Sequence, residues 1–331
     1  MPAALAPDRI LKELADLWVS LGKQGESEGG AGVLRACSMT LVVLAEESED
    51  VAALGETMAA LMPEHPARTI LIRLRGAGER TLADRVYAQC WMPFGQRRQI
   101  CCEQIEITAS DVALADLASV VLPLAVPDLP LIVWCRSPRL VAMPEFRDIS
   151  AMAQKVVLDT SAMPDGPAAM HQLANLSERG VLLGDLSWTR LTRWREMLSQ
   201  VFENRSYLAL LDQVSTVKVS FGGRYQVPAW YMGTWVVNAL AHAGLHADLS
   251  VAGESGDSFL RLEVAGAGLR VVLARTQDRL DITVNDFSNC TNLPQPTDYL
   301  LIREELGIVR HDPVFETTLA SSARLAYPTN K

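Results

Sequence analysis

The chain has 331 residues, of which 49% are hydrophobic, 21% charged and 6% aromatic, a composition typical of folded globular proteins. Its 30 basic and 39 acidic residues give a net charge of −9, which argues against general binding to nucleic acid or to an anionic membrane surface. A chain of this length predicts about two domains, with a core large enough to need neither disulfides nor a structural metal.

The first half of the chain alternates helix and strand patterns. Apolar residues at helical spacing predict an amphipathic helix over residues 8–21, followed by a flexible linker rich in Gly, Glu and Ser over residues 22–32. The two longest strand patterns flank a turn-rich joint, which predicts an antiparallel hairpin. Together these elements indicate a mixed sheet covered by helices. The predicted strands are 39–44, 69–75, 82–91, 99–108, 131–135 and 155–159, and the predicted helices are 49–61, 114–124 and 168–178.

The second half shows a different order of elements. Residues 189–202 form a helix pattern, 214–221 a strand pattern and 228–243 an apolar helix pattern. Three or four short strands separated by Gly- or Asp-containing turns then predict an antiparallel meander over 247–284, and the tail from 298 to 325 is largely helical. We therefore expect an α/β (α+β) fold with two domains. These are an N-terminal α/β mixed-sheet domain, 1–185, and a C-terminal α+β domain with a small antiparallel sheet, 186–331.

The apolar tracts and the cysteines indicate where in the cell the protein is expected. The N-terminus lacks the basic and apolar regions of a secretory signal, and prolines, acids, polar residues or glycines interrupt the longest apolar tracts. We therefore expect no membrane-spanning segment. The cysteines lack CxxC spacing and mostly lie in apolar runs, which favours buried, reduced thiols over a redox role. Reduced thiols in turn favour a cytoplasmic location. The six are Cys37, Cys90, Cys101, Cys102, Cys135 and Cys290.

No motif predicts a catalytic, cofactor or metal site. The three GxG triplets lack the third glycine and the strand–turn–helix context of a dinucleotide loop, so we interpret them as turns. His242 and His246 are four residues apart, but Gly244 between them is expected to end the helix, which favours structural histidines over metal ligands. We accordingly assign no catalytic residue, no metal and no cofactor.

A first arginine-rich segment runs from Arg68 to Arg98. It contains seven arginines and only two acids. Strand alternation places Arg73 and Arg75 on the face opposite the apolar residues. With Arg68, Arg97 and Arg98 they could bind a phosphorylated ligand or an acidic partner. The alternative, a solvated sheet face with intramolecular ion pairs, is favoured.

A second segment, Asp185–Arg195, combines tryptophan and arginine, the residues most enriched at binding hot spots. Arg195 borders the buried face of its helix and would need an acidic partner, for which Asp185 is a candidate. The partner-binding candidates here are Trp188, Arg190, Arg193 and Trp194. A structural role in anchoring the segment is the favoured alternative.

Four motifs, in order, resemble the glucose-6-phosphate dehydrogenase assembly protein (OpcA) family of cyanobacteria and actinobacteria. They are His65–Arg68 (HPAR), Cys102–Gln104 (CEQ), Leu122–Pro130 (LPLAVPDLP) and Trp188–Arg195 (WTRLTRWR). The tail segments Glu304–Leu306 and Asp312–Phe315 are similar to the C-terminal end of that family. The resemblance adds His65 to the binding candidates. It also implies a structural role for six motif residues, which are Glu103, Pro127, Asp128, Trp134, Asp185 and Arg195.

The resemblance implies a non-catalytic protein that binds glucose-6-phosphate dehydrogenase and promotes its active oligomer in the oxidative pentose phosphate pathway. Two alternatives stay open. One is a phosphosugar- or nucleotide-binding α/β enzyme that uses the Arg68–Arg98 surface, and the other is a subunit that only keeps the dehydrogenase in solution. The chain departs from the family at Ala67, where Ser is common, and at Cys135, where a second Trp is common. A C-terminal cysteine pair is missing, so redox control is not implied.

Overall fold

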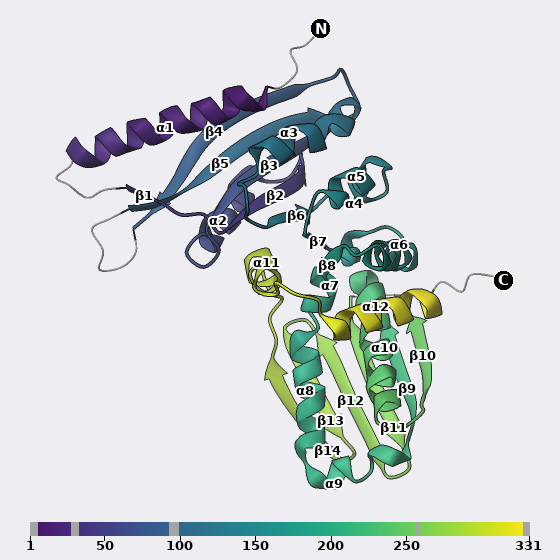
Figure 1. The fold of residues 1–331 in the computed structure, drawn as a ribbon. Coiled ribbons are helices and arrows are strands. Elements are labelled where there is room, and N and C mark those ends of the chain that lie inside the picture. The colour runs from purple at the N-terminus through teal and green to yellow at the C-terminus, as the bar shows by residue number, and fades with distance from the viewer. Residues whose placement is uncertain (1–5, 28–32, 93–98, 256–257, 327–331) are drawn as a thin grey trace. The chain divides into compact units, whose positions relative to one another are not determined.

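The computed structural model describes residues 6–27, 33–92, 99–255 and 258–326. The chain divides into two compact units, each with its own sheet and helices, which confirms the predicted α/β class (Figure 1). The first unit comprises Met1–Leu158 with Val181–Leu183, and the second comprises Asp159–Gly180 with Gly184–Lys331. The boundary near residue 185, between domains that fold separately, stays a prediction.

The first unit is built on an eight-stranded sheet in its described part, with the order β1-β5-β3-β2-β6-β7-β8 and with β4 paired to β5 outside this path. β4 runs antiparallel to β5, which confirms the predicted hairpin, and the pairs from β1 through β5, β3, β2 and β6 to β7 are parallel. The strands are β1 (Val33–Arg35), β2 (Met39–Glu46), β3 (Ala67–Gly76), β4 (Leu82–Trp91), β5 (Gln99–Ser110), β6 (Leu131–Cys135), β7 (Lys155–Leu158) and β8 (Leu182–Asp185).

The strand order of this sheet is that of a doubly wound fold. From β2 the chain adds β3 and β5 on one side, then returns to add β6, β7 and β8 on the other. The order therefore reverses between β2 and β6, the point at which such sheets bind ligands. Residues Met39–Ala45 of β2 are all buried, as expected for a nearly continuous apolar run in a parallel sheet covered on both faces.

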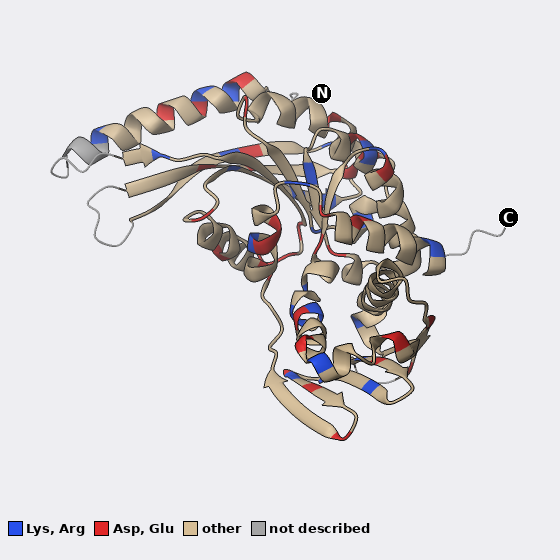
Figure 2. Cartoon of the chain, turned by 60° about the horizontal axis from the view of Figure 1, so that its bottom comes forward, with Lys and Arg blue, Asp and Glu red and all other residues tan. Residues whose placement is uncertain are grey.

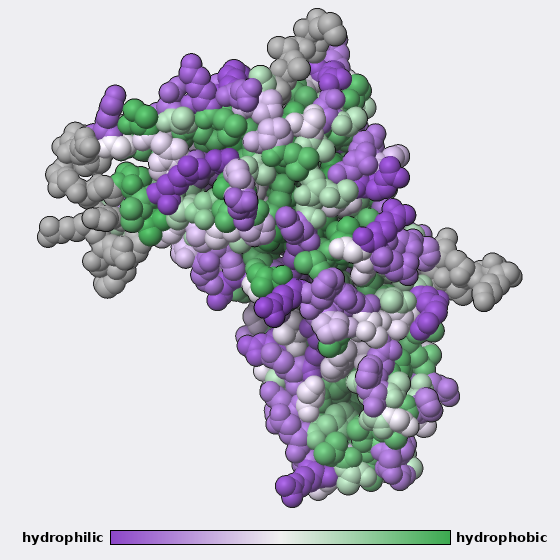
Figure 3. Space-filling view, viewed as in Figure 1, coloured by the Kyte–Doolittle hydropathy of each residue, from purple (hydrophilic) through white to green (hydrophobic). Residues whose placement is uncertain are grey.

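Helix α1 extends further than the sequence predicts. It runs from Pro7 to Ser27, so the predicted linker is wrong for residues 22–27, and residues 28–32 lie outside the described part. Each glycine costs a helix only about 1 kcal/mol relative to alanine, and Gly22 and Gly25 stand among good helix formers, Lys, Gln and Glu. Charged residues of both signs lie along this helix (Figure 2), and its outer side is hydrophilic (Figure 3). The remaining helices of the unit are α2 (Val51–Leu61), η1 (Asp111–Asp116), α3 (Leu117–Leu124), α4 (Pro138–Val141) and α5 (Glu145–Ala151).

The second unit is built on a six-stranded sheet in the order β10-β9-β11-β12-β13-β14. β9 and β10 are parallel, and β11 to β14 form an antiparallel meander. The predicted meander is therefore wrong for β10, because the helix α10 between β9 and β10 returns the chain in the same direction. The strands are β9 (Val214–Phe221), β10 (Asp248–Gly253), β11 (Leu260–Gly266), β12 (Leu269–Thr276), β13 (Arg279–Val284) and β14 (Phe287–Asn292).

Three glycines shape this unit. A Cβ at Gly266 would meet the carbonyl oxygen of Gln213 at 1.8 Å, and Gly268 has a φ of +76°, so the triplet 266–268 forms a hairpin turn as interpreted. Gly244, with a φ of +77°, follows the end of α10, which separates His246 from that helix. The helices are η2 (Thr160–Ala162), α6 (Gly166–Glu178), α7 (Leu186–Thr189), α8 (Thr192–Glu203), α9 (Arg205–Leu208), η3 (Leu211–Gln213), η4 (Gly223–Tyr225), α10 (Gln226–His242), α11 (Asp298–Gly307) and α12 (Pro313–Ala326).

Candidate functional site

A buried ion-pair cluster joins the motifs of the first unit. Arg68 on β3 is 7% exposed; its Nε lies 2.5 Å from Oε2 of Glu103 on β5, and its NH1 donates to the carbonyl of Leu124 at 2.7 Å. Trp18 of α1 donates to Glu103 Oε1 at 2.5 Å, and Arg35 NH2 lies 2.9 Å from the same oxygen. Arg68 is therefore not available to the ligand-binding basic surface for which the sequence made it a candidate, because Glu103 already neutralises it inside the unit.

Arg73, Arg75 and Arg80 of the first segment also have intramolecular partners, and that of Arg80 is Asp116. Arg73 donates to the carbonyl of Glu47 at 2.7 Å, and Arg75 binds the Glu47 carboxylate at 3.0 to 3.2 Å. These hydrogen bonds lower the pKa of Glu47. The pairs match the alternative of a solvated face with ion pairs. His65 is half-buried, and Arg97 and Arg98 lie outside the described residues.

Charged side chains fill the point where the strand order reverses. Glu46, the last residue of β2, accepts a hydrogen bond from Ser137 and lies 3.2 Å from Arg139 NH2. Arg139 NH1 in turn lies 2.6 Å from Asp111 Oδ1, after β5. A doubly wound sheet that binds a dinucleotide holds its pyrophosphate here, on the first helix N-terminus.

The N-terminus of α2 does not offer the free amides that a pyrophosphate needs. Asp50 accepts hydrogen bonds from the amides of Ala52 and Ala53 at 2.9 and 3.3 Å. The neighbouring Glu49 is paired with Arg136 at 2.7 Å. A phosphate would meet carboxylates instead of amides, so these residues do not fit a dinucleotide cofactor.

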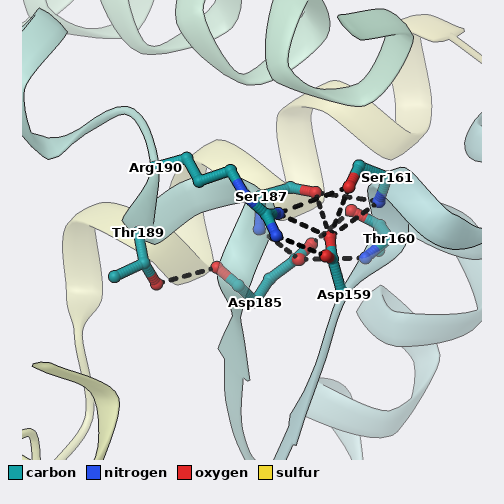
Figure 4. A network of polar contacts seen from close by, with 7 residues as sticks. All are labelled: Asp159, Thr160, Ser161, Asp185, Ser187, Thr189 and Arg190. Atoms are coloured by element: carbon teal, nitrogen blue, oxygen red, sulfur yellow. Dashed lines mark hydrogen bonds and ion pairs between the residues drawn. The ribbon is translucent and has the colours of Figure 1, made fainter. Parts of the chain in front are cut away.

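A second polar network lies in the second unit, where β7 and β8 end (Figure 4). Arg190 binds both carboxylate oxygens of Asp159, at 2.8 and 2.7 Å. The hydroxyls of Ser161 and Ser187 donate to Asp159 Oδ1 at 2.6 and 3.0 Å. Burial alone would raise the pKa of Asp159, but the hydrogen bonds and charge of Arg190 outweigh it and lower the pKa. The bidentate pair fixes the chain after β7.

Asp185 is the centre of the same network and is fully buried. It accepts hydrogen bonds from the Thr160 hydroxyl at 2.6 Å, the Ser187 amide at 2.9 Å and the Tyr231 hydroxyl at 2.8 Å. Burial, and to a smaller extent the charge of Asp159, raise the pKa of Asp185 to about 6. The hydroxyls of Ser161 and Ser187 both donate to the Asp159 carboxylate and not to a histidine, so the network has the form of a structural brace and not of a nucleophile with its base.

Arg195 has partners other than the one predicted. It stacks on Trp188, with its Cζ 3.6 Å from the ring centroid, and donates to the Trp188 carbonyl at 2.9 Å and to Thr192 at 3.2 Å. The suggested pairing with Asp185 is wrong, because Asp185 points to Thr160 and Tyr231. Burial lowers the pKa of Arg195 to about 10. Trp188 also packs against Tyr231 and Phe315.

The tail packs against the Trp188–Arg195 segment. Thr189 donates to buried Glu305 at 2.6 Å, Thr192 to Glu304 at 2.8 Å, and Trp188 Nε1 to Asp312 at 3.4 Å. Segments more than 100 residues apart in sequence therefore meet in the second unit, with the Thr189–Glu305 contact buried and the Thr192–Glu304 contact at the surface. The motif residues of each unit converge on a polar cluster of its own.

The remaining predicted residues divide between surface and core. Trp188 and Trp194 are 4% and 1% exposed, so neither is a surface hot spot, whereas the Arg193 side chain is 69% exposed and pairs with Glu196. Trp134 is buried, and the Cζ of Arg136 lies over its ring, 4.7 Å from the ring centroid. Pro127 and Asp128 are exposed, and Asp128 has a φ of +64°, a left-handed turn conformation.

Sequence reasoning missed Asp159, Thr160, Tyr231 and Glu305. Asp159 carried one detectable signal, since an acid at the end of a strand pattern, followed by Thr and Ser, is typical of a capping turn. Tyr231 lies within an apolar helix, and nothing in its neighbourhood indicates a buried hydrogen-bond partner. Glu305 stands in a tail motif, but only the tertiary structure reveals its partner Thr189.

The cysteines correct part of the prediction. Cys90 and Cys101 lie directly opposite each other on β4 and β5 and form a disulfide, so the prediction of reduced thiols is wrong for these two. Cys102 and Cys135 are buried, and burial raises their pKa values to about 11 and about 12, which keeps them as unreactive thiols. Cys290 is exposed.

In the described ranges, no cluster of three or more His, Cys, Asp or Glu side chains is arranged to hold a metal ion. None of the helices described is both long and apolar enough to cross a bilayer.

Comparison with protein families decides the relationship. Residues 58–175 match the model described as the glucose-6-phosphate dehydrogenase subunit N-terminal domain, and residues 181–319 match that of the C-terminal domain. The chain belongs to the OpcA family. The resemblance seen in the sequence motifs is thereby confirmed. Family members are assigned to the oxidative pentose phosphate (OxPP) cycle.

The curated relatives are cyanobacterial and longer. A protein of Synechocystis sp. provisionally named OxPP cycle protein OpcA is 28% identical over 193 residues, which cover 56% of this chain and 39% of the relative. A Synechococcus elongatus protein of the same name is 26% identical over 183 residues, 54% of this chain and 40% of the relative. The match thus spans about two fifths of the length of these relatives.

Solved structures show a distant likeness. A dehydrogenase from Chromobacterium violaceum is 10% identical with a TM-score of 0.49, and the match covers 88% of this chain and 94% of that one. At this TM-score we base no argument on it.

Proposed function

We propose that this chain binds glucose-6-phosphate dehydrogenase and promotes its active oligomer, without a catalytic site of its own. The observation that carries the proposal is that both halves match family models described as domains of a glucose-6-phosphate dehydrogenase subunit. The carboxylates at the point where the strand order reverses support it further, since they disfavour binding of a dinucleotide cofactor. The cytoplasmic location predicted from the cysteine pattern is part of this proposal.

The mechanism is a shift between two states of the dehydrogenase. A protein that binds the active oligomer more tightly than the inactive form stabilises the active form by the difference in binding free energy. A coupling of about 1–3 kcal/mol changes the equilibrium by about 5- to 150-fold. Activation of this size requires no new chemistry and only a surface that distinguishes the two states.

The surface of α8 supplies one candidate contact. Arg193 is 69% exposed, and its partner Glu196 is 45% exposed, so the pair is held loosely and can exchange for an acidic group of a partner. Trp194 and Leu198 of the same helix are buried, which holds Arg193 on a fixed frame. The exposed guanidinium, presented from this fixed helix, is well suited to a carboxylate on the dehydrogenase.

The test combines purified chain with the cognate dehydrogenase. We expect a complex on gel filtration, together with a higher specific activity or a lower KM of the dehydrogenase. Arg193→Glu should weaken the complex, whereas the matched variant Arg147→Glu, at a side chain that is 73% exposed in the first unit, should not. Absence of a complex with unchanged kinetics would contradict the proposal. A complex without activation would support the alternative of a subunit that only keeps the enzyme in solution.

A further inference from the structure

Among the residues that the structure describes, no strand pairs with the outer edge of β14 in the second unit's sheet. Strand β14 pairs with β13 along its whole length and stands last in the strand order (Figure 1). All six of its residues are exposed, and Phe287 at its start is 75% exposed. An edge strand in this state presents unpaired backbone groups that a further strand can join.

This edge lacks the usual protection. Natural edge strands carry charges or proline that discourage pairing with another chain. β14 has the sequence FSNCTN, without a charged residue or proline, although 21% of the chain is charged. By contrast, β10 at the other edge begins with Asp248, and β4 in the first unit carries Asp84 and Arg85, with Arg9 of α1 paired to Asp84.

The backbone of β14 has hydrogen-bonding groups available for a partner. A two-residue turn joins β13 to β14, with Val284 and Phe287 as the closing pair and Asn285 at a φ of +50°. Because hydrogen-bonded and non-hydrogen-bonded pairs alternate, the amide of Cys290 points away from β13. It donates to the side-chain oxygen of Asn289 at 2.8 Å, a local substitute that a partner strand can displace.

We propose that this edge pairs with β14 of a second copy of the chain, antiparallel about a two-fold axis at Cys290. In this register Phe287 lies opposite Leu293 of the second copy, so each exposed ring meets an apolar side chain. Pairing about Asn289 would instead place Phe287 opposite Thr291. The absence of charge along β14 favours a second copy, because two chains of net charge −9 can then meet here without like charges in direct contact.

The size of the contact sets its strength. Joining two six-residue edge strands buries less surface than a standard stable interface, so the self-association is weak and lies in the micromolar range. The proposal does not depend on binding to the dehydrogenase, and the two are tested separately.

The first experiment measures the mass of the full chain by sedimentation across the micromolar range, under reducing conditions. The expected result is a monomer–dimer equilibrium that Cys290→Pro abolishes without changing the melting temperature. Proline is tolerated here because the Cys290 amide is not used in the ladder with β13. The matched Cys290→Ser variant should still dimerise. A chain that stays monomeric, or a dimer that survives Cys290→Pro, would overturn the proposal.

The second experiment fixes the register. Oxidation with diamide, which takes up the two electrons and two protons released by a pair of thiols, should link Cys290 to Cys290 of the second copy. Peptide mapping should find this link in the wild type and not in Cys290→Ser. A dimer linked only through other cysteines would contradict the register. If Cys290→Pro weakens only the complex with the dehydrogenase while the wild type alone is monomeric, the edge binds the dehydrogenase and self-pairing is refuted.

Discussion

Replacing Glu103 with alanine should destabilise the first unit strongly. The substitution leaves the guanidinium of Arg68 in an environment where it is only 7% exposed, and it removes the acceptor of Trp18 and the partner of Arg35. Breaking a buried ion pair from one side costs about 3–5 kcal/mol, because the remaining charge stays desolvated. At about 2–4 °C per kcal/mol for a unit of this size, the midpoint should fall by about 6–20 °C.

Thermal and urea unfolding followed by circular dichroism measure this loss. The matched control is the double variant Arg68→Met with Glu103→Leu, which removes both charges and fills a similar volume. It should be clearly more stable than Glu103→Ala, since no buried unpaired charge remains; Arg35 also loses its partner, but its side chain is 46% exposed. A loss of less than about 1 kcal/mol in Glu103→Ala, the size expected of an exposed pair, would refute the assignment of this cluster as a buried brace.

Three further predictions concern the second unit and the binding of nucleotides. The pKa of Asp185 is 3.8 in the unfolded chain and about 6 in the folded one, so the free energy of unfolding of the wild type should fall by up to about 3 kcal/mol relative to that of Asp185→Asn as the pH rises from 4 to 7. Urea unfolding at a series of pH values measures this difference, and parallel pH profiles for the two proteins would contradict it. Arg195→Ala should lower stability by about 2–3 kcal/mol and Arg195→Lys by less, and unaltered melting would show that the stacking on Trp188 contributes nothing. NADP and NADPH should not raise the melting temperature, and a saturable rise would restore the nucleotide-binding alternative.

Much of the fold follows from hydrophobic periodicity. The apolar run from Met39 and the alternation before Arg75 identify β2 and β3, and the turn-rich joint between two long strand patterns predicts the β4–β5 hairpin. Periodicity does not report strand direction, so the parallel pairing of β10 with β9 was accessible only through the helix between them. β14 lacks apolar alternation altogether, because its six residues are solvent-exposed, and no pattern predicts it.

The site residues were predicted less well than the fold. Composition identified the arginines, but whether Arg68 faces solvent or Glu103 depends on a partner 35 positions away in sequence. Asp185 and Arg195 were placed together because they are near each other along the chain. The structure instead joins Asp185 to Thr160 and Tyr231, contacts that only the tertiary fold creates. Local sequence thus indicates which residues carry charge, while burial and pairing depend on distant segments.

The most direct test of the proposed role is a titration of the full chain into its cognate glucose-6-phosphate dehydrogenase, with the mass of the assembly and the rate per dehydrogenase subunit followed together. The account predicts that both rise with added chain and reach a plateau at the same ratio. Separate elution of the two proteins, with a rate that does not change at any ratio, would contradict it.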